Sequence, residues 1–144
     1  MLVHQILKSK GDDGVVTVEP GTLVSDAATI LAERRIGTVV ISTDGTRAEG
    51  ILSERDIVRA LAARGAVCLG WSVDEMMTRD LQTCARDDLA DAILARMTEG
   101  RFRHMPVVEG GQLVGLITLG DVVKARLSEL AMEKDALQGM IMGF

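Results

Sequence analysis

An internal duplication constrains this chain more than any other feature of its sequence. Residues 50–56 read GILSERD, and residues 115–121, which lie 65 positions later, read GLITLGD. The spacing grows to 66 where Ile36 matches Phe102. Single-residue insertions in loops account for a change of this kind, because loops tolerate them. The sequence therefore predicts two similar structural units in tandem.

Each half shows the same order of predicted elements, β-α-β-β-α. Short apolar or β-branched runs predict strands, and apolar residues at helical spacing predict amphipathic helices. Asp44-Gly45 and Gly110-Gly111 separate the last two strands of their halves and favour hairpin turns. The predicted strands are 15–18, 38–41 and 49–52, then 81–84, 104–108 and 113–117; the predicted helices are 24–32 and 53–63, then 89–97 and 118 onward.

The fold class expected from this order is α/β, of the α+β kind. Residues 1–66 are assigned to a first repeat, 67–128 to a second repeat and 129–144 to a C-terminal helical extension. Residues 3–8 resemble residues 73–77, so each half is expected to open with a helical turn.

Composition limits the classes of function that the chain can have. Of its 144 residues, 47% are apolar but only 2% are aromatic, so the core is expected to be aliphatic. The formal net charge of -5 opposes general nucleic-acid binding, which needs clustered basic residues. No apolar run has the roughly 18 residues that cross a bilayer, and the start lacks a signal-peptide layout. We expect a cytoplasmic protein that binds neither membranes nor nucleic acid.

Few residues of the chain suit catalysis or metal binding. Cys68 and Cys84 are isolated and are expected to be free thiols in a reducing compartment. With only His4 and His104 beside them, no metal site of histidine and cysteine is predicted. No phosphate-binding G-x-x-x-x-G-K-[ST] motif and no G-x-S-x-G elbow occur. The protein is therefore not expected to be an enzyme.

The two glycine-to-aspartate stretches allow a structural and a functional interpretation. Ser53 with Asp56, and Thr118 with Asp121, have the spacing of helix capping boxes. Each hydroxyl also follows a predicted strand, at a helix N-terminus that attracts phosphate. An ionised carboxylate nearby can accept hydrogen bonds from ribose hydroxyls. A hydroxyl and a carboxylate in this arrangement indicate a nucleotide site, and they occur twice.

The chain resembles a pair of cystathionine-β-synthase-type (CBS) domains, known as a Bateman module, of the small stand-alone type. In the first half the resemblance rests on VVTVEPGTLVSDA, RRIGTVVI and GILSERDIVRAL. In the second half it rests on LQTCARDDLADA, RFRHMPVVEGGQLVGLIT and GDVVKARL. These segments cover nearly the whole chain in the same order twice.

The resemblance implies that the two repeats pack through their sheets and leave two clefts for adenosine-containing ligands: AMP, ADP, ATP, NAD or S-adenosylmethionine. It assigns phosphate to the motif hydroxyls, ribose to the motif aspartates, and the base to main chain near the strands. The ligand-binding residues so predicted are Thr17, Ile36, Gly37, Thr38, Val39, Ser53, Arg55, Asp56, Thr83, Arg103, His104, Met105, Pro106, Thr118 and Asp121.

The halves differ around their motifs. Arg103 and His104 stand where the first half has Gly37 and Thr38. We expect the second-half site, flanked by Arg101, Arg103 and His104, to take the more phosphorylated group. Lys10 and Arg101 are further candidates for phosphate contacts, although Lys10 more readily fits an ordinary exposed lysine, and a solvated basic rim is the alternative for Arg101, Arg103 and His104.

The expected function is that of a non-catalytic sensor of adenine nucleotides that acts on an unknown regulated protein. The alternative is a structural or protein-interaction module whose clefts are vestigial. A disc-like homodimer is expected to cover apolar helix faces that include Ile57, Leu61, Val122 and Ala125. The last helix carries an apolar stripe interrupted by Lys134, and we expect it to pack between molecules rather than fold back: Val123, Leu127, Leu130, Leu137 and Ile141.

Overall fold

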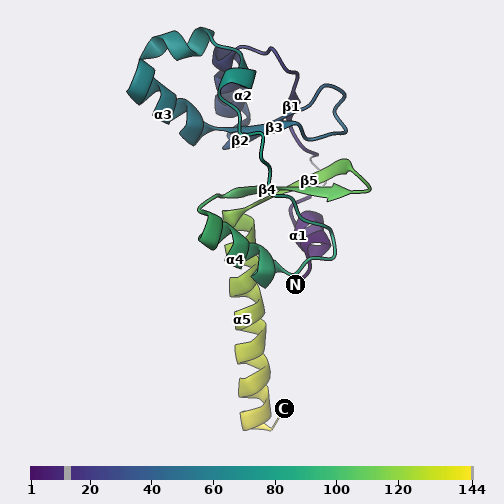
Figure 1. Ribbon diagram of the computed structural model, residues 1–144. Coiled ribbons are helices and arrows are strands. Elements are labelled where there is room, and N and C mark those ends of the chain that lie inside the picture. The colour runs from purple at the N-terminus through teal and green to yellow at the C-terminus, as the bar shows by residue number, and fades with distance from the viewer. Residues whose placement is uncertain (12–13, 144) are drawn as a thin grey trace.

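The computed structural model of the chain describes residues 1–11 and 14–143. Two small sheets face each other in the middle of the molecule (Figure 1). The helices of each half cover the outer side of their own sheet, and the last helix extends far from the rest. The mixed α+β fold predicted from the duplicated sequence is confirmed.

The first half forms a sheet of three strands with the order β1-β2-β3. β1 runs parallel to β2, whereas β3 is antiparallel to it, with Val40 opposite Ile51. Both helices cover one side of this sheet. The elements are β1 (Thr17–Val18), α2 (Val24–Arg34), β2 (Thr38–Ile41), β3 (Gly50–Ser53) and α3 (Glu54–Arg64).

The second half repeats this arrangement around a two-stranded sheet, β4-β5. Gly110 and Gly111 join the strands with φ of 58° and 79°, and a tight hairpin turn of this kind needs positive φ at both positions. The register shifts between Val107 and Val108. The elements are α4 (Ala90–Gly100), β4 (His104–Glu109), β5 (Gln112–Thr118) and α5 (Leu119–Met142).

The strand predicted at 81–84 is wrong, because only Cys84 pairs, in a single bridge with Val107. In the first half the amide of Val40 donates to the carbonyl of Val16 at 3.1 Å. The residue that corresponds to Val40 is Pro106, which has no N–H group to donate. The pairing that lengthens β1 therefore cannot form in the second half. β1 itself is shorter than the predicted 15–18.

The opening segment of each half packs into the core of the other. Helix α1 (Val3–Ser9) buries Val3 and Ile6 in the core of the second half. The short helices η1 (Ala66–Gly70) and η2 (Val73–Glu75) link the halves, and Val73 is buried in the core of the first. The expected helical turns are present, and they are exchanged between the repeats.

Two glycines allow these opening segments to approach the sheets. A Cβ atom on Gly115 would lie 2.7 Å from Leu7 of α1, and one on Gly50 would lie 2.5 Å from Met77. Real Cβ atoms do not approach neighbours so closely. The glycine of each motif therefore makes room for the side chain of an opening segment.

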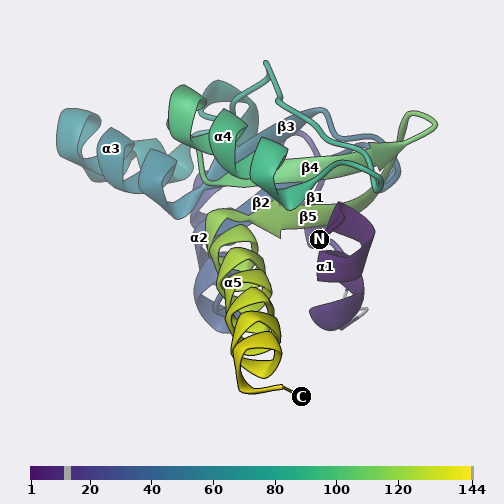
Figure 2. The same cartoon turned by 90° about the horizontal axis from the view of Figure 1, so that it is seen from below.

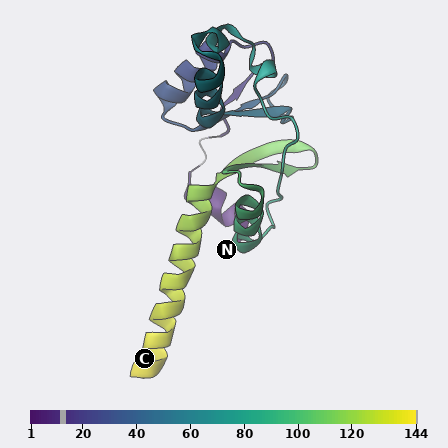
Figure 3. The ribbon, with the colours of Figure 1, turned by 60° about the vertical axis from the view of Figure 1, so that its left-hand side comes forward.

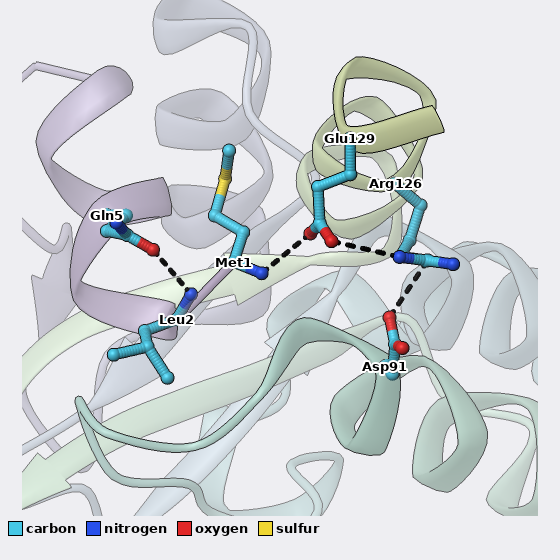
Figure 4. A network of polar contacts seen from close by, with 6 residues as sticks. All are labelled: Met1, Leu2, Gln5, Asp91, Arg126 and Glu129. Carbon is cyan, nitrogen blue, oxygen red and sulfur yellow. Dashed lines mark hydrogen bonds and ion pairs between the residues drawn. The ribbon is translucent and has the colours of Figure 1, made fainter. Parts of the chain in front are cut away.

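A polar network holds the base of α5. The amino group of Met1 lies 2.7 Å from Oε1 of Glu129, and Arg126 bonds both Glu129 and Asp91 of α4 (Figure 4). The hydrogen bond from Met1 is the main reason that the pKa of Glu129 lies below its usual value. Helices α1 and α4 lie beside these first turns of α5 (Figure 2).

The rest of α5 projects away from the domain (Figure 3). Leu127, Leu130, Leu137 and Ile141 are exposed, so the stripe does not fold back on its own domain. The prediction of exposed Ile57, Val122 and Ala125 is wrong, since all three are buried in the two cores. Leu61 is half-buried against the first core.

Candidate functional site

Two clefts lie between the repeats, and they differ in size and charge. The larger has a volume of about 990 Å³ and is lined by the start of α3, the 78–82 link, residues 100–104 and the start of α5. The smaller has a volume of about 390 Å³ and is lined by the end of α1, residues 14–16, residues 35–38 and strand β5. Gly37, His104 and Thr118 line both clefts.

Each cleft brings the motif of one repeat together with the strand residues of the other. Ser53 and Asp56 share the larger cleft with Arg101 and Arg103. The smaller cleft instead combines Thr118 with first-half residues 35–38 and with Lys10. Arg101 and Arg103 were expected to flank both Thr118 and Asp121 of the second-half motif. They share the larger cleft with Thr118, but Asp121 does not line that cleft, so the expectation is wrong for Asp121.

The structure brings most of the predicted residues to the clefts, including both hydroxyls. The predicted residues on the larger cleft are Gly37, Ser53, Arg55, Asp56, Arg101, Arg103, His104 and Thr118. Those on the smaller are Lys10, Ile36, Gly37, Thr38, His104 and Thr118. Six predicted residues, all within the described chain, line neither of these two clefts: Thr17, Val39, Thr83, Met105, Pro106 and Asp121.

Sequence reasoning missed several wall residues, among them Arg35 in the smaller cleft. Arg35 and the predicted Arg101 both follow the end of a helix with positive φ, of 54° and 57°. The matching places of these two arginines in the two halves could have indicated Arg35 as well. Arg59, Asp80 and Phe102 line the larger cleft without any local pattern that marks them.

Both motifs form complete capping boxes. The amide of Asp56 donates to Oγ of Ser53 at 3.2 Å, and the amide of Ser53 donates to Oδ2 of Asp56 at 2.9 Å. The second motif repeats this geometry, with distances of 3.1 and 2.9 Å between Thr118 and Asp121. The structural interpretation is thus confirmed, and each carboxylate keeps its Oδ1 atom for a further partner.

The first helical amide also has a protein acceptor in each repeat. The amide of Glu54 donates to the carbonyl of Gly37 at 2.9 Å, and the amide of Leu119 donates to that of Arg103 at 2.8 Å. The helix N-termini therefore offer fewer unpaired N–H groups to a phosphate than the sequence led us to expect. Each of these bonds ties a helix start to the chain just before a cleft-lining strand.

The two aspartates differ in their ionic surroundings. Nζ of Lys10 lies 2.8 Å from Oδ2 of Asp121 and 2.9 Å from the carbonyl oxygen of Leu116. Oδ2 of Asp121 thus accepts from an ammonium group and an amide, whereas Oδ2 of Asp56 accepts from the Ser53 amide. The second motif therefore has a cation beside its acid, and that cation, Lys10, lines the smaller cleft.

His104 lies at the junction of the two clefts. Burial lowers its pKa below the ordinary value, while Glu54 acts in the opposite direction. The imidazole is consequently neutral near pH 7, and the charge of the predicted basic cluster comes from Arg101 and Arg103. A neutral imidazole can donate one hydrogen bond and accept another.

Two further searches of residues 1–11 and 14–143 bear on function. No group of three or more histidine, cysteine, aspartate or glutamate side chains is placed to hold a metal ion. Within the same residues, no helix combines the length and the apolar character needed to cross a membrane.

Comparisons with known proteins agree with this architecture. A crystal structure of the CBS-domain containing protein ATU1752 from Agrobacterium tumefaciens is 44% identical, covers 88% of this chain and 99% of its own, and has a TM-score of 0.83. The CBS domain protein PAE2072 from Pyrobaculum aerophilum, complexed with AMP, is 28% identical, with coverages of 92% and 99% and a TM-score of 0.77.

A third similar structure is the CBS domain pair of MJ0100 in complex with 5-methylthioadenosine and S-adenosyl-L-methionine. It is 25% identical, with coverages of 90% and 98% and a TM-score of 0.78. Two CBS domain-containing proteins of Arabidopsis thaliana, CBSCBSPB2 and CBSCBSPB3, are 34% and 33% identical over 86% of this chain. The chain spans only 23% and 22% of their length.

The family model of the CBS domain matches the chain twice, at residues 11–63 and 73–128. The first match begins after α1 and runs from β1 to α3, and the second runs from η2 into α5. The chain therefore belongs to the CBS domain family and carries a pair of CBS domains.

Proposed function

We propose that the protein is a non-catalytic regulatory module that binds adenosine-containing ligands, of the AMP, ADP, ATP or NAD class, in its two clefts. The observation that carries this proposal is the crossed construction of the clefts. A ligand held by the motif of one repeat would also touch the strand residues of the other. Binding would thus change how the repeats sit against each other, and a partner protein would sense that change.

The similar structures support the class of ligand. One of them is complexed with AMP, and another with 5-methylthioadenosine and S-adenosyl-L-methionine. The shared part of these molecules is adenosine. Volumes of about 390 and 990 Å³ lie in the range of clefts that hold small molecules.

Isothermal titration calorimetry with AMP, ADP, ATP, NAD and S-adenosylmethionine tests the proposal. Wild-type protein is expected to bind at least one of them, and the Asp56→Ala, Asp121→Ala double variant is expected to lose that binding. Because both aspartates also cap helices, folding of the variant must be checked by circular dichroism. Asp26→Ala is a matched control, since Asp26 lies in the first turn of α2 and lines neither of the two clefts.

Absence of binding in the wild type, or equal binding by the double variant, would contradict the ligand proposal. The complete capping boxes would then have a purely structural role. The clefts would be vestigial, and the protein would act as an interaction module.

The larger cleft is proposed to take the more phosphorylated ligand. Arg101 and Arg103 both line it, and guanidinium groups suit phosphate. Arg103→Ala is expected to weaken ATP binding more than AMP binding, because the extra phosphates lose a charged partner. Unchanged affinities for both nucleotides would contradict this assignment.

We also propose that the protein is a homodimer to which α5 contributes. Val123, Leu127, Leu130, Lys134, Leu137 and Ile141 alternate at spacings of four and three residues, as the core positions of a two-stranded coiled coil do. The buried Val122 and Ala125 lie on another face of the helix. The seam is therefore free along its length to meet the same seam of a second copy.

Charge favours a second copy in parallel orientation as the occupant. In a parallel pair Lys134, at a core position, would lie beside Glu133 of the other chain, at a flanking position. The isologous contact would place both modules at the same end of the paired helices.

Sedimentation of two matched variants tests this dimer. Leu137 is on the seam and 59% exposed, whereas Met132 is on the opposite side of the helix and 64% exposed. Leu137→Asp is expected to give a monomer, and Met132→Asp is expected to leave the dimer intact. An unchanged mass for Leu137→Asp would contradict the coiled coil. Ile141→Cys is expected to form a disulfide between copies only if the helices are parallel.

The two cysteines support a reducing compartment as the place of action. Both are free and buried, and neither forms a disulfide. We propose the cytoplasm on this ground.

A further inference from the structure

The two opening segments place opposite charges at equivalent positions of the clefts. Leu7 meets Gly115 as Met77 meets Gly50, so these segments correspond at a spacing of 70 residues. Antiparallel bridges from Leu2 and Ser72 agree with this spacing. Three residues beyond Leu7 stands Lys10, on the smaller cleft, and three beyond Met77 stands Asp80, on the larger.

The ammonium group of Lys10 is held in place. It lies 2.8 Å from Oδ2 of Asp121 and 2.9 Å from the carbonyl oxygen of Leu116, with about a third of the side chain exposed. Oδ2 of Asp121 also accepts from the amide of Thr118 at 2.9 Å, as part of the capping box of α5. Lys10 and this capping box therefore share one carboxylate oxygen. The charge of Lys10 thus stands beside the hydroxyl and the acid of the second motif.

We propose that Lys10 makes the smaller cleft prefer AMP to unphosphorylated adenosine, and that the corresponding place in the larger cleft carries the negative charge of Asp80 instead, so that phosphate is attracted there by Arg101 and Arg103. The inference rests on the proposed function. The phosphate of a ligand in the smaller cleft can accept a hydrogen bond from the ammonium group of Lys10, which also lines that cleft. Adenosine without phosphate has no anionic group to pair with the ammonium group, so it gains no charge-assisted hydrogen bond from Lys10.

The ligand pair that tests the proposal is AMP and adenosine, which differ only by the phosphate. Titration of the full chain followed by amide NMR separates the clefts, since Gly115 lines only the smaller and Val58 only the larger of the two. The measured quantity is the ratio of the affinity for AMP to that for adenosine, taken at Gly115. A ratio cancels losses of stability that affect both ligands equally.

Lys10→Met keeps the length of the side chain but removes its charge. The ratio at Gly115 is expected to fall about tenfold, as for loss of one hydrogen bond to a charged group. Lys10→Arg is expected to restore most of the ratio. Lys8→Met is the matched control, because Lys8 is exposed on the same helix and lines neither cleft, and it is expected to leave the ratio unchanged.

Asp80→Lys supplies the opposite test. It places an ammonium group in the larger cleft, so the ratio measured at Val58 is expected to rise several-fold, on the order of one charged hydrogen bond. An unchanged ratio in Lys10→Met, with AMP and adenosine both bound, would overturn the role of Lys10 and leave the proposed function intact. Failure of the wild type to bind either ligand would instead overturn both.

Discussion

Gly115 offers a direct test of how the exchanged opening segment packs. In Gly115→Ala the new methyl group would meet Cδ2 of Leu7 at 2.7 Å and Cδ1 at 2.9 Å. Gly115 lies in β5 with ordinary extended backbone, so alanine is not strained by φ. The expected cost in the folded state is therefore a steric conflict between β5 and α1.

The size of the effect follows from two opposed contributions. Overpacking of this kind costs about 1–3 kcal/mol. Replacing glycine by alanine inside a strand returns about 0.5–1 kcal/mol, because the unfolded chain loses less freedom on folding. Gly115→Ala is thus expected to lower the free energy of unfolding by about 1–2 kcal/mol. In a chain that already carries Leu7→Ala the conflict is gone, so Gly115→Ala should be neutral or stabilising.

Urea denaturation of the wild type, the two single variants and the double variant tests whether Gly115→Ala destabilises the wild type but not the Leu7→Ala protein. The midpoint and slope of each curve together give a free energy of unfolding, and the four values form a double-mutant cycle. Equal destabilisation by Gly115→Ala in both backgrounds would refute the packing argument. Gly50→Ala, which meets the more adaptable Met77, is expected to cost less than Gly115→Ala.

Further expectations concern titration, thiol reactivity and the caps. Burial lowers the pKa of His104, so the imidazole binds a proton more readily in the unfolded chain than in the folded one. The free energy of unfolding should therefore fall as the pH is lowered from about 7.5 to 5.5. His104→Gln should remove this pH dependence, measured by urea denaturation at each pH. Burial, aided by Asp88, raises the pKa of Cys84 to about 11, and Cys68 is fully buried; Ellman's reagent at neutral pH should react with neither until the protein unfolds. Ser53→Ala and Thr118→Ala should each cost about 1 kcal/mol in the ligand-free protein, measured by thermal unfolding.

The local pattern of the sequence predicted most of the fold. Apolar periodicity placed the four long helices, and paired glycines placed the second hairpin. The missing strand near Cys84 depends on a residue far along the chain, since Pro106 lacks the donor that Val40 supplies. Whether a strand forms is thus decided by its neighbour in the sheet as well as by its own residues.

The site was predicted less fully, for a similar reason. Both motifs were found from their spacing, and their hydroxyls do line clefts. Which basic residues face which motif depends on how the repeats meet, and repetition alone does not determine that. The ion pair between Lys10 and Asp121 joins residues 111 positions apart, so no local pattern could reveal it. The burial of Val122 and Ala125 likewise follows from α1 and α4, which close over the base of α5.

The exchange of opening segments bears on how such a chain could arise. A single ancestral repeat with the same packing would expose the pocket for its own opening turn and could fill it only from a second molecule. The ancestral unit would accordingly be a swapped dimer, with Val3 of one copy in the core of the other. Joining the two copies end to end turns that encounter between molecules into a reaction within one chain, at an effective concentration that dilution cannot lower. Neither half of the present chain, cut near residue 66, carries the whole of its own core.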